Sequence, residues 1–171
     1  IPASPSLYGD QSDRHTLCVS TQVGCAYGCK FCASGLDGFK RDLEPSEIID
    51  QVLATERWHK EQDGVGERLI NNLVIMGMGE PLMNYNNVMK AVEKITSDEG
   101  LGMSAKRITI STSGVPKMIK KLADDEAKIK LAVSLHAATD EVRTRIMPFN
   151  ETFPLEDLRE ALEYWYSKTK S

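Results

Sequence analysis

Apolar and polar positions alternate along the chain with two different periods. Four short apolar runs are typical of strands, and five longer segments repeat their apolar residues every three or four positions, as amphipathic helices do. The predicted strands span residues 16–22, 69–77, 107–112 and 129–136. The predicted helices span residues 45–61, 87–97, 115–124, 140–147 and 154–168. Since every strand precedes a helix, we expect an α/β fold with parallel strands, as an open doubly wound sheet or a β/α barrel. Near-continuous apolar runs such as "LAVSL" predict strands buried on both faces.

Each predicted strand ends in a polar or glycine-rich segment. The first strand leads into the cysteine loop (residues 23–35), and the others end in "MGMGEP" (76–81), "ISTSG" (110–114) and "SLH" (134–136). Taken singly, such segments are also typical of turns and helix caps. Because the carboxyl ends of parallel strands meet at one edge of a sheet, we expect the four segments to face one pocket.

The composition is that of a globular domain with a small negative charge. Lysine and arginine number 21 against 25 aspartates and glutamates, and we interpret the basic groups Lys40-Arg41 and Arg143/Arg145 as surface charge. No apolar run approaches the roughly 18 residues of a membrane span, so no membrane partner is expected. Four cysteines in 171 residues are too few for a disulfide scaffold. Their bunching indicates metal or redox chemistry in a reducing compartment, cytoplasmic or organellar.

The stretch "VGCAYGCKFCASG" holds three of the four cysteines. Cys25, Cys29 and Cys32 fall within eight residues, while Cys18 lies on the first predicted strand. Structural zinc usually takes two separated pairs of ligands, and a thioredoxin-like pair should open a helix, which the residues after Cys32 do not continue. A cluster of four irons normally takes four thiolates, so three leave one iron open for a further ligand. The spacing favours the cluster over the other two sites.

The spacing CxxxCxxC, with Phe31 just before the last cysteine, resembles the hallmark of the radical SAM superfamily. The resemblance implies a partial (β/α) barrel with this loop after its first strand, of which about four βα units are present. It also implies a 4Fe-4S cluster held by Cys25, Cys29 and Cys32, and S-adenosylmethionine bound at the open iron. In such enzymes an electron from the cluster splits the sulfonium bond and produces a 5′-deoxyadenosyl radical.

Longer stretches are similar to the RlmN/Cfr family of RNA methyltransferases. They are "LCVSTQVGCAYGCKFCASG", "GFKRDL", "MGMGEPLMNYNNV", "RITISTSGVPKMI", "LAVSLHAATDEVR" and "IMPFNETFPLEDL". The resemblance implies a methyltransferase that modifies an adenosine, at carbon 2 in the RlmN branch and carbon 8 in the Cfr branch, and we expect carbon 2. The expected partners are large-subunit ribosomal RNA, transfer RNA as a further substrate, and an electron donor such as a flavodoxin or ferredoxin.

The same resemblance implies roles for single residues. Six positions match the family's cofactor-contacting residues: Gly79, Glu80, Ser111, Ser134, Leu135 and His136. Glu80 is expected to offer its carboxylate to the cofactor's amino group. Cys18 matches the thiol that resolves the covalent RNA intermediate by pairing transiently with a methylated cysteine. The alternative for Cys18 is a small buried strand residue.

The chain is expected to be an incomplete piece of such an enzyme. Residues 1–15 are interpreted as an N-terminal connecting segment and residues 16–171 as an incomplete radical SAM core. The family's methyl-carrying cysteine lies beyond Ser171, so this piece alone is expected to be inactive in methyl transfer. Two alternatives stay open: another radical SAM enzyme with a non-RNA substrate, and a metal-stabilised segment that binds RNA without catalysis.

Overall fold

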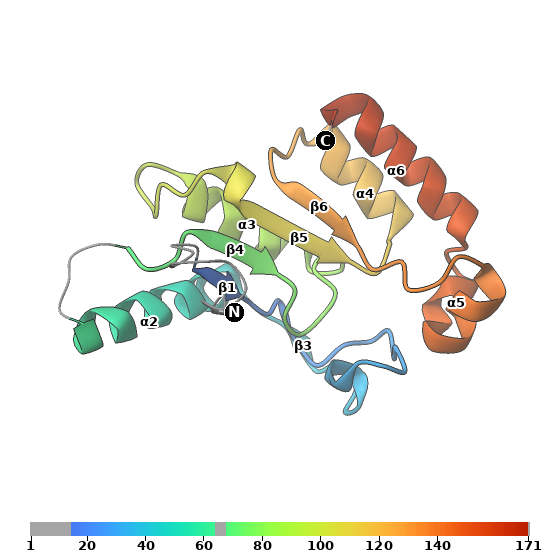
Figure 1. The fold of residues 1–171 in the computed structure, drawn as a ribbon, viewed down its shortest axis with the longest axis horizontal. Helices are drawn as coiled ribbons and strands as arrows, with labels where there is room; N and C mark the ends of the chain where they lie inside the picture. Colours follow the sequence, from blue (N-terminus) through green and yellow to red (C-terminus); the bar gives the residue numbers. More distant parts are fainter. Residues whose placement is uncertain (1–14, 64–67, 171) are drawn as a thin grey trace, which may run out of the picture.

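A four-stranded parallel sheet forms the centre of the computed structural model, which describes residues 15–63 and 68–170. The strands β1 (Thr16–Cys18), β4 (Asn72–Ile75), β5 (Ile108–Thr112) and β6 (Lys130–Val133) lie side by side in that order. Every neighbouring pair is parallel. A helix follows each strand (Figure 1), so the predicted α/β fold with four βα units of a partial barrel is confirmed.

One face of the sheet is buried beneath helices. The described α-helices are α2 (Pro45–Asp63), α3 (Tyr85–Thr96), α4 (Pro116–Asp124), α5 (Asp140–Ile146) and α6 (Leu155–Thr169). Alternate strand residues such as Leu73, Ile75, Ile108 and Ile110 share one hydrophobic core with the apolar stripes of α2, α3, α4 and α6. Helices α4 and α6 pack side by side (Figure 1). The apolar stripes predicted from the sequence are therefore the core-facing surfaces.

The opposite face of the sheet is open and largely polar. Thr16, Asn72 and Thr109 lie on it and line a hollow of about 700 Å³. Buried and half-buried residues alternate along β4 and β5, because successive side chains of a strand point to opposite faces. The expectation that apolar runs are buried on both faces is thus wrong for the described residues. The outer strand β6 contains no fully buried residue at all.

The strands are shorter than predicted. β1 ends at Cys18 rather than residue 22, and β6 ends at Val133 rather than residue 136. Beyond Cys18 the amide of Gln22 donates to the carbonyl of Met78, in the loop after β4, and no longer takes part in the sheet. At the other outer strand His136 has a φ of 58°, which is incompatible with extended backbone.

A small hairpin was not predicted. β2 (Gln22–Val23) and β3 (Arg41–Asp42) pair in antiparallel fashion and close the base of the cysteine loop. Two residues are too few to show the alternation that marks a strand in a sequence. Short 3-10 turns complete the described elements: η1 (Ala33–Gly35), η2 (Ala105–Arg107) and η3 (Pro148–Glu151).

Residues 1–14 of the predicted connecting segment 1–15 lie outside the described residues, so this boundary stays a prediction. In the described part of the chain, none of the helices combines the length and the apolar character needed to cross a membrane.

Candidate functional site

The cysteine loop lies beyond the carboxyl end of the sheet, toward which the arrows of β4, β5 and β6 point (Figure 1). At its base, Gln22 donates from Nε2 to Asp42 (2.8 Å) and accepts at Oε1 from the amide of Glu80 (2.8 Å). At its other side, the amide of Lys30 donates to the carbonyl of Ile146 in α5 (2.9 Å). Hydrogen bonds thus hold the loop between the end of β4 and helix α5.

One pocket of about 140 Å³ gathers the three loop cysteines and the ends of β4, β5 and β6. Seven of the predicted metal- and cofactor-binding residues line it: Cys25, Cys29, Cys32, Gly79, Glu80, Ser111 and Ser134. The four strand-end segments therefore do meet in one place. The ligand of this pocket stays a prediction.

Burial and mutual repulsion disfavour ionisation of Cys25 and Cys29. Burial raises the pKa of Cys25, and the negative charges of Glu80 and Cys32 raise it further. Burial also raises the pKa of Cys29 to about 11, with repulsion from Cys25 and Cys32 adding to the effect. Thiolates so close together require positive charge among them. The three cysteines therefore fit an iron–sulfur cluster, whose irons supply that charge.

The thiols surround the pocket without converging on one point. Within residues 15–63 and 68–170, no three histidine, cysteine or carboxylate side chains are grouped so that they could hold a single metal ion. Zinc gathers all its ligands around one ion, whereas each thiolate of a cluster binds a different iron. The four cysteines are all free thiols, and Cys29 and Cys32 form no disulfide.

Glu80 joins the ends of β4 and β5. Its carboxylate is buried and accepts three hydrogen bonds, from the Leu82 amide (3.0 Å), the Thr112 hydroxyl (2.8 Å) and the Ser113 amide (2.7 Å). Burial raises the pKa of Glu80, and these hydrogen bonds oppose that shift. The carboxylate thus orders two strand-end loops, while its contact with a cofactor amino group stays a prediction.

The two residues predicted after Ser134 do not line the pocket. The Leu135 side chain is 49% exposed and faces a separate apolar groove beside α6. The His136 ring packs against Phe31 of the cysteine loop, with centroids 4.4 Å apart. His136 also adopts a left-handed φ, a conformation that non-glycine residues hold mainly at functional or tightly constrained sites. Their predicted cofactor contacts stay predictions.

Cys18 lies on β1, outside the pocket. In the sheet register Cys18 pairs with Val74, and Val74 pairs with Thr109. Paired residues point to the same face, so Cys18 faces the open side of the sheet, as Ser111 does two residues beyond Thr109. The thiol is exposed, so the alternative of a small buried residue is wrong.

Sequence reasoning missed Arg143. The structure buries it completely, whereas Arg145 is exposed and pairs with Glu141, as the surface interpretation predicts. In a sequence, a charged helical residue two positions from another charged residue is normally interpreted as exposed. The spacing of Arg143, Met147 and Asn150, which are all buried, is the signal that could have separated the two arginines. Met147 also lines the pocket, although no predicted strand-end segment contains it, whereas Met76, Thr112 and Ser113 lie in predicted segments but were not singled out.

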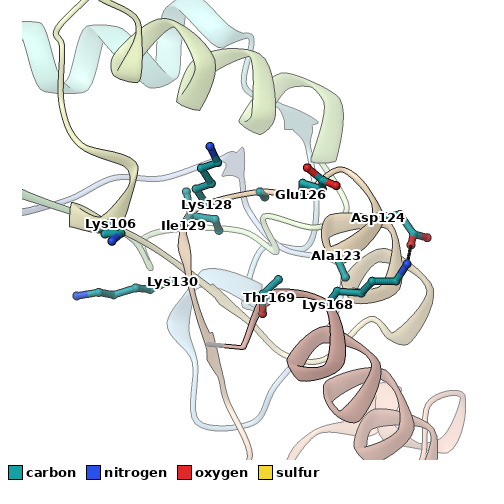
Figure 2. Close-up of a pocket in the computed structure, with 10 residues that line it drawn as sticks. Lys106, Ala123, Asp124, Glu126, Lys128, Ile129, Lys130, Lys168 and Thr169 are labelled. Carbon is teal, nitrogen blue, oxygen red and sulfur yellow. Dashed lines mark ion pairs between the residues drawn. The ribbon is translucent and has the colours of Figure 1, made fainter.

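A second hollow, of about 630 Å³, lies near the amino end of β6 (Figure 2). The cysteine pocket lies at the carboxyl end of the same strand, where Ser134 lines it. Its wall carries Lys106, Lys128, Lys130 and Lys168. Lys168 lies 3.9 Å from Asp124, which also lines the hollow. No residue predicted to bind a metal or cofactor lines this hollow, so the cysteine pocket is the candidate site.

Known proteins resemble the chain over almost all of its length. The radical SAM superfamily model matches residues 19–169. A protein of Christiangramia forsetii, described as a probable dual-specificity RNA methyltransferase RlmN, is 73% identical over 158 residues, or 92% of this chain and 44% of that protein. A protein of the same description from Aquifex aeolicus is 52% identical over 155 residues, or 90% of this chain and 43% of that protein.

A solved structure shares the fold. The crystal structure of a radical SAM methyltransferase from Sphaerobacter thermophilus superposes with a TM-score of 0.87 at 42% identity, over 94% of this chain and 46% of that chain. The chain thus spans less than half the length of these relatives. The relatives confirm the resemblance to the RlmN/Cfr family. With three cysteines beside the ends of a parallel sheet and a superfamily match over residues 19–169, the chain belongs to the radical SAM superfamily.

Proposed function

We propose that this chain is the cofactor-binding core of a radical SAM RNA methyltransferase. The observation that carries the proposal is the single pocket in which three thiols meet the ends of three parallel strands. Cys25, Cys29 and Cys32 would hold a 4Fe-4S cluster. The cofactor-contacting positions matched in the sequence would bind S-adenosylmethionine: Gly79, Glu80, Ser111, Ser134, Leu135 and His136.

The residues of the chain position these groups. When bound, the cluster and S-adenosylmethionine supply one-electron chemistry that can act on a carbon that is not a nucleophile. The hydrogen bonds of Glu80 fix the ends of β4 and β5 to each other, so that Ser111 faces the same pocket as the thiols. Because the thiols must lose their protons to bind iron, cluster assembly is favoured as the pH rises.

The substrate proposed is an adenosine of large-subunit ribosomal RNA, methylated at carbon 2, with transfer RNA as a further substrate. The names of the relatives support RNA methyl transfer. A flavodoxin or ferredoxin is proposed as the electron donor, in a reducing cytoplasmic or organellar compartment. The methyl group is proposed to pass through a cysteine.

Cys18 is proposed to release the RNA from its covalent link to that methyl-carrying cysteine. Its sulfur would attack the sulfur of the linkage and form a disulfide. The sulfur–carbon bond to the RNA would break, and the carbon would keep the electron pair and take a proton. An exposed thiol on the open face of the sheet is accessible for such an attack.

The test uses the full-length protein, reconstituted with iron and sulfide without oxygen, and a ribosomal RNA transcript. After reduction with S-adenosylmethionine present, the RNA is digested and its nucleosides are separated by mass spectrometry. We expect 2-methyladenosine. 8-Methyladenosine would overturn the choice of carbon, whereas cofactor cleavage without RNA methylation would indicate a radical SAM enzyme with another substrate. Bound zinc without acid-labile sulfide would support a non-catalytic RNA-binding segment.

A further inference from the structure

Arg143 is a buried cation that has no role in the proposed reaction. Its side chain is completely inaccessible, although α5 is a short helix at the surface of the molecule. Among the described residues its guanidinium takes part in none of the ion pairs. Burying a cation without a carboxylate partner is costly unless other acceptors replace the water that the cation loses. The hydrogen bonds and ring contacts of Arg143 indicate its role.

Backbone carbonyls take the place of a carboxylate. Arg143 donates from Nη2 to the carbonyl of Ser113 (2.5 Å) and from Nε to the carbonyl of Leu135 (3.1 Å). A longer contact joins Nη2 to the carbonyl of Ser134 (3.4 Å). These carbonyls belong to the segments that follow β5 and β6. One rigid planar group therefore spans the ends of two neighbouring strands.

The backbone at Ser113 is held from both sides. Its amide donates to the buried carboxylate of Glu80 (2.7 Å), and its carbonyl accepts from the buried guanidinium of Arg143 (2.5 Å). An anion from the β4 loop and a cation from α5 thus fix the end of β5 between them. Ser111, two residues earlier, lies on the wall of the cysteine pocket.

The guanidinium is also linked to the cysteine loop. It lies over the ring of Phe149, 5.2 Å from the centroid, and Phe149 stacks on Tyr27 of the loop with centroids 4.6 Å apart. Burial lowers the pKa of Arg143, and the nearby negative charges of Asp140 and Cys29 oppose that shift. The two stacked rings thus connect Arg143 to the loop that carries the thiols.

We propose that Arg143 is a positioning residue that fixes the cofactor-facing ends of β5 and β6 relative to the cysteine loop. The inference rests on the proposed function, because it takes the pocket to hold a cluster and S-adenosylmethionine. The three thiols sit on their own loop, so loss of Arg143 leaves the cluster ligands in place. It loosens the strand ends that face the cofactor.

Two substitutions in the full-length protein test the positioning role. Arg143→Lys keeps the charge, but one ammonium group cannot reach carbonyls that a planar fork spans. Arg143→Met removes both. The matched control is Arg145→Met, since Arg145 lies on the same helix, is exposed and, among the described residues, forms its ion pair with Glu141 alone. For each variant we would measure iron content, the Kd for S-adenosylmethionine and the EPR change on cofactor addition.

All three variants are expected to retain iron. For Arg143→Met and Arg143→Lys the Kd should rise about tenfold, the effect of losing one charge-assisted hydrogen bond, and the EPR response should shrink. Arg145→Met should match the unchanged protein in every measurement. An unchanged Kd in Arg143→Met would overturn the proposal.

A purely structural role for Arg143 would be seen as joint loss of fold, iron and cofactor binding. In that case Asn150→Ala tests the positioning role. Asn150 accepts a hydrogen bond from Arg143 Nη1, so its replacement leaves the guanidinium in place but less firmly held. We expect this variant to fold and its Kd to rise about threefold, less than for removal of the guanidinium itself. An unchanged Kd in folded Asn150→Ala would then overturn the positioning role. Absence of a cluster from the unchanged protein would instead overturn the proposed function itself.

Discussion

The four cysteines differ in position, and the difference predicts which of them bind iron. Cys25, Cys29 and Cys32 line the pocket, whereas Cys18 is exposed on β1. Replacing any one of the first three with alanine should reduce bound iron and acid-labile sulfide to background after reconstitution, since a cluster with two thiolates is poorly held. Cys18→Ala should keep the full complement. An equal loss of iron in Cys18→Ala would mean that Cys18 is a fourth ligand.

Gly79 occupies a position where a side chain does not fit. It has a φ of 104°, and a Cβ added to it would lie 2.6 Å from the Cβ of Gln22. Gly79→Ala should therefore displace the Gln22 side chain that bonds to the Glu80 amide, and should cost about 1–3 kcal/mol of folding free energy.

The control for this substitution is Gly102→Ala. Gly102 also has a positive φ, 57°, but a Cβ there would meet nothing within 4 Å. Denaturant unfolding should show a larger loss for Gly79→Ala than for Gly102→Ala, together with weaker cofactor binding only in the first. Similar losses in the two variants would mean that backbone strain, and not the contact with Gln22, decides the cost.

The buried carboxylate of Glu80 accepts from three donors, which an amide cannot do with one oxygen. Glu80→Gln should therefore lower the free energy of unfolding by about 2 kcal/mol, because at least one buried donor loses its acceptor. Urea unfolding measures this loss, and the exposed Glu99→Gln serves as the control. A stability equal to that of the unchanged protein would show that the three hydrogen bonds contribute nothing net to the fold.

At the level of elements, the helices were more predictable than the strands. The helix at Leu155–Thr169 lies within one residue of its prediction, because apolar residues recur along its fifteen positions and face one core. β1 has only three residues, and where it ends depends on a hydrogen bond from Gln22 to Met78, more than fifty residues away in the chain. No local pattern records such a contact.

Asp140 connects the start of α5 with the start of α6. Its carboxylate accepts from the Leu155 amide (2.8 Å) and from Asn150 Nδ2 (2.9 Å), and these hydrogen bonds hold its pKa below the usual value. Since the folded pKa is the lower one, this stabilisation is fully present above about pH 4 and is lost as the pH falls through the folded value.

Thermal melts between about pH 6 and pH 2 test this prediction. The melting temperature of the unchanged protein should fall more steeply below about pH 4 than that of Asp140→Asn, in which no proton is taken up at this position. Asp98→Asn, at an exposed residue of the loop after α3, should reproduce the unchanged profile. Parallel profiles for Asp140→Asn and the unchanged protein would show that the charge of Asp140 does not contribute.

Over the whole molecule, the residues that line the pocket were more predictable than the residues that hold its walls in place. The sequence places polar residues at the ends of successive parallel strands, and topology alone brings such ends together. That is why Ser111 and Ser134 were found beside the cysteines. Arg143 could not be recognised in the same way. Its burial depends on carbonyls of two other segments and on Phe149, all of which reach it only in the folded chain.

The sheet of the described residues has two outer strands, β1 and β6. Outer strands present unpaired amides and carbonyls, which favour pairing with another chain. When residues 1–171 are produced alone, we therefore expect self-association in size-exclusion chromatography with light scattering. A sharp monomer peak with a cooperative melt would contradict this expectation.

A charge on the open face of β6 should reduce that association. Ala132 pairs with Ser111 across the sheet and is half-buried, so Ala132→Lys places a charge on the open face of the outer strand, and a lysine on an edge strand discourages edge pairing. Ser104→Lys, at an exposed position before η2, adds the same charge away from the edge. We expect a larger monomer fraction in Ala132→Lys than in Ser104→Lys at equal concentration. Equal fractions would mean that the chains associate through β1 or another surface, because only Ala132→Lys alters the edge of β6.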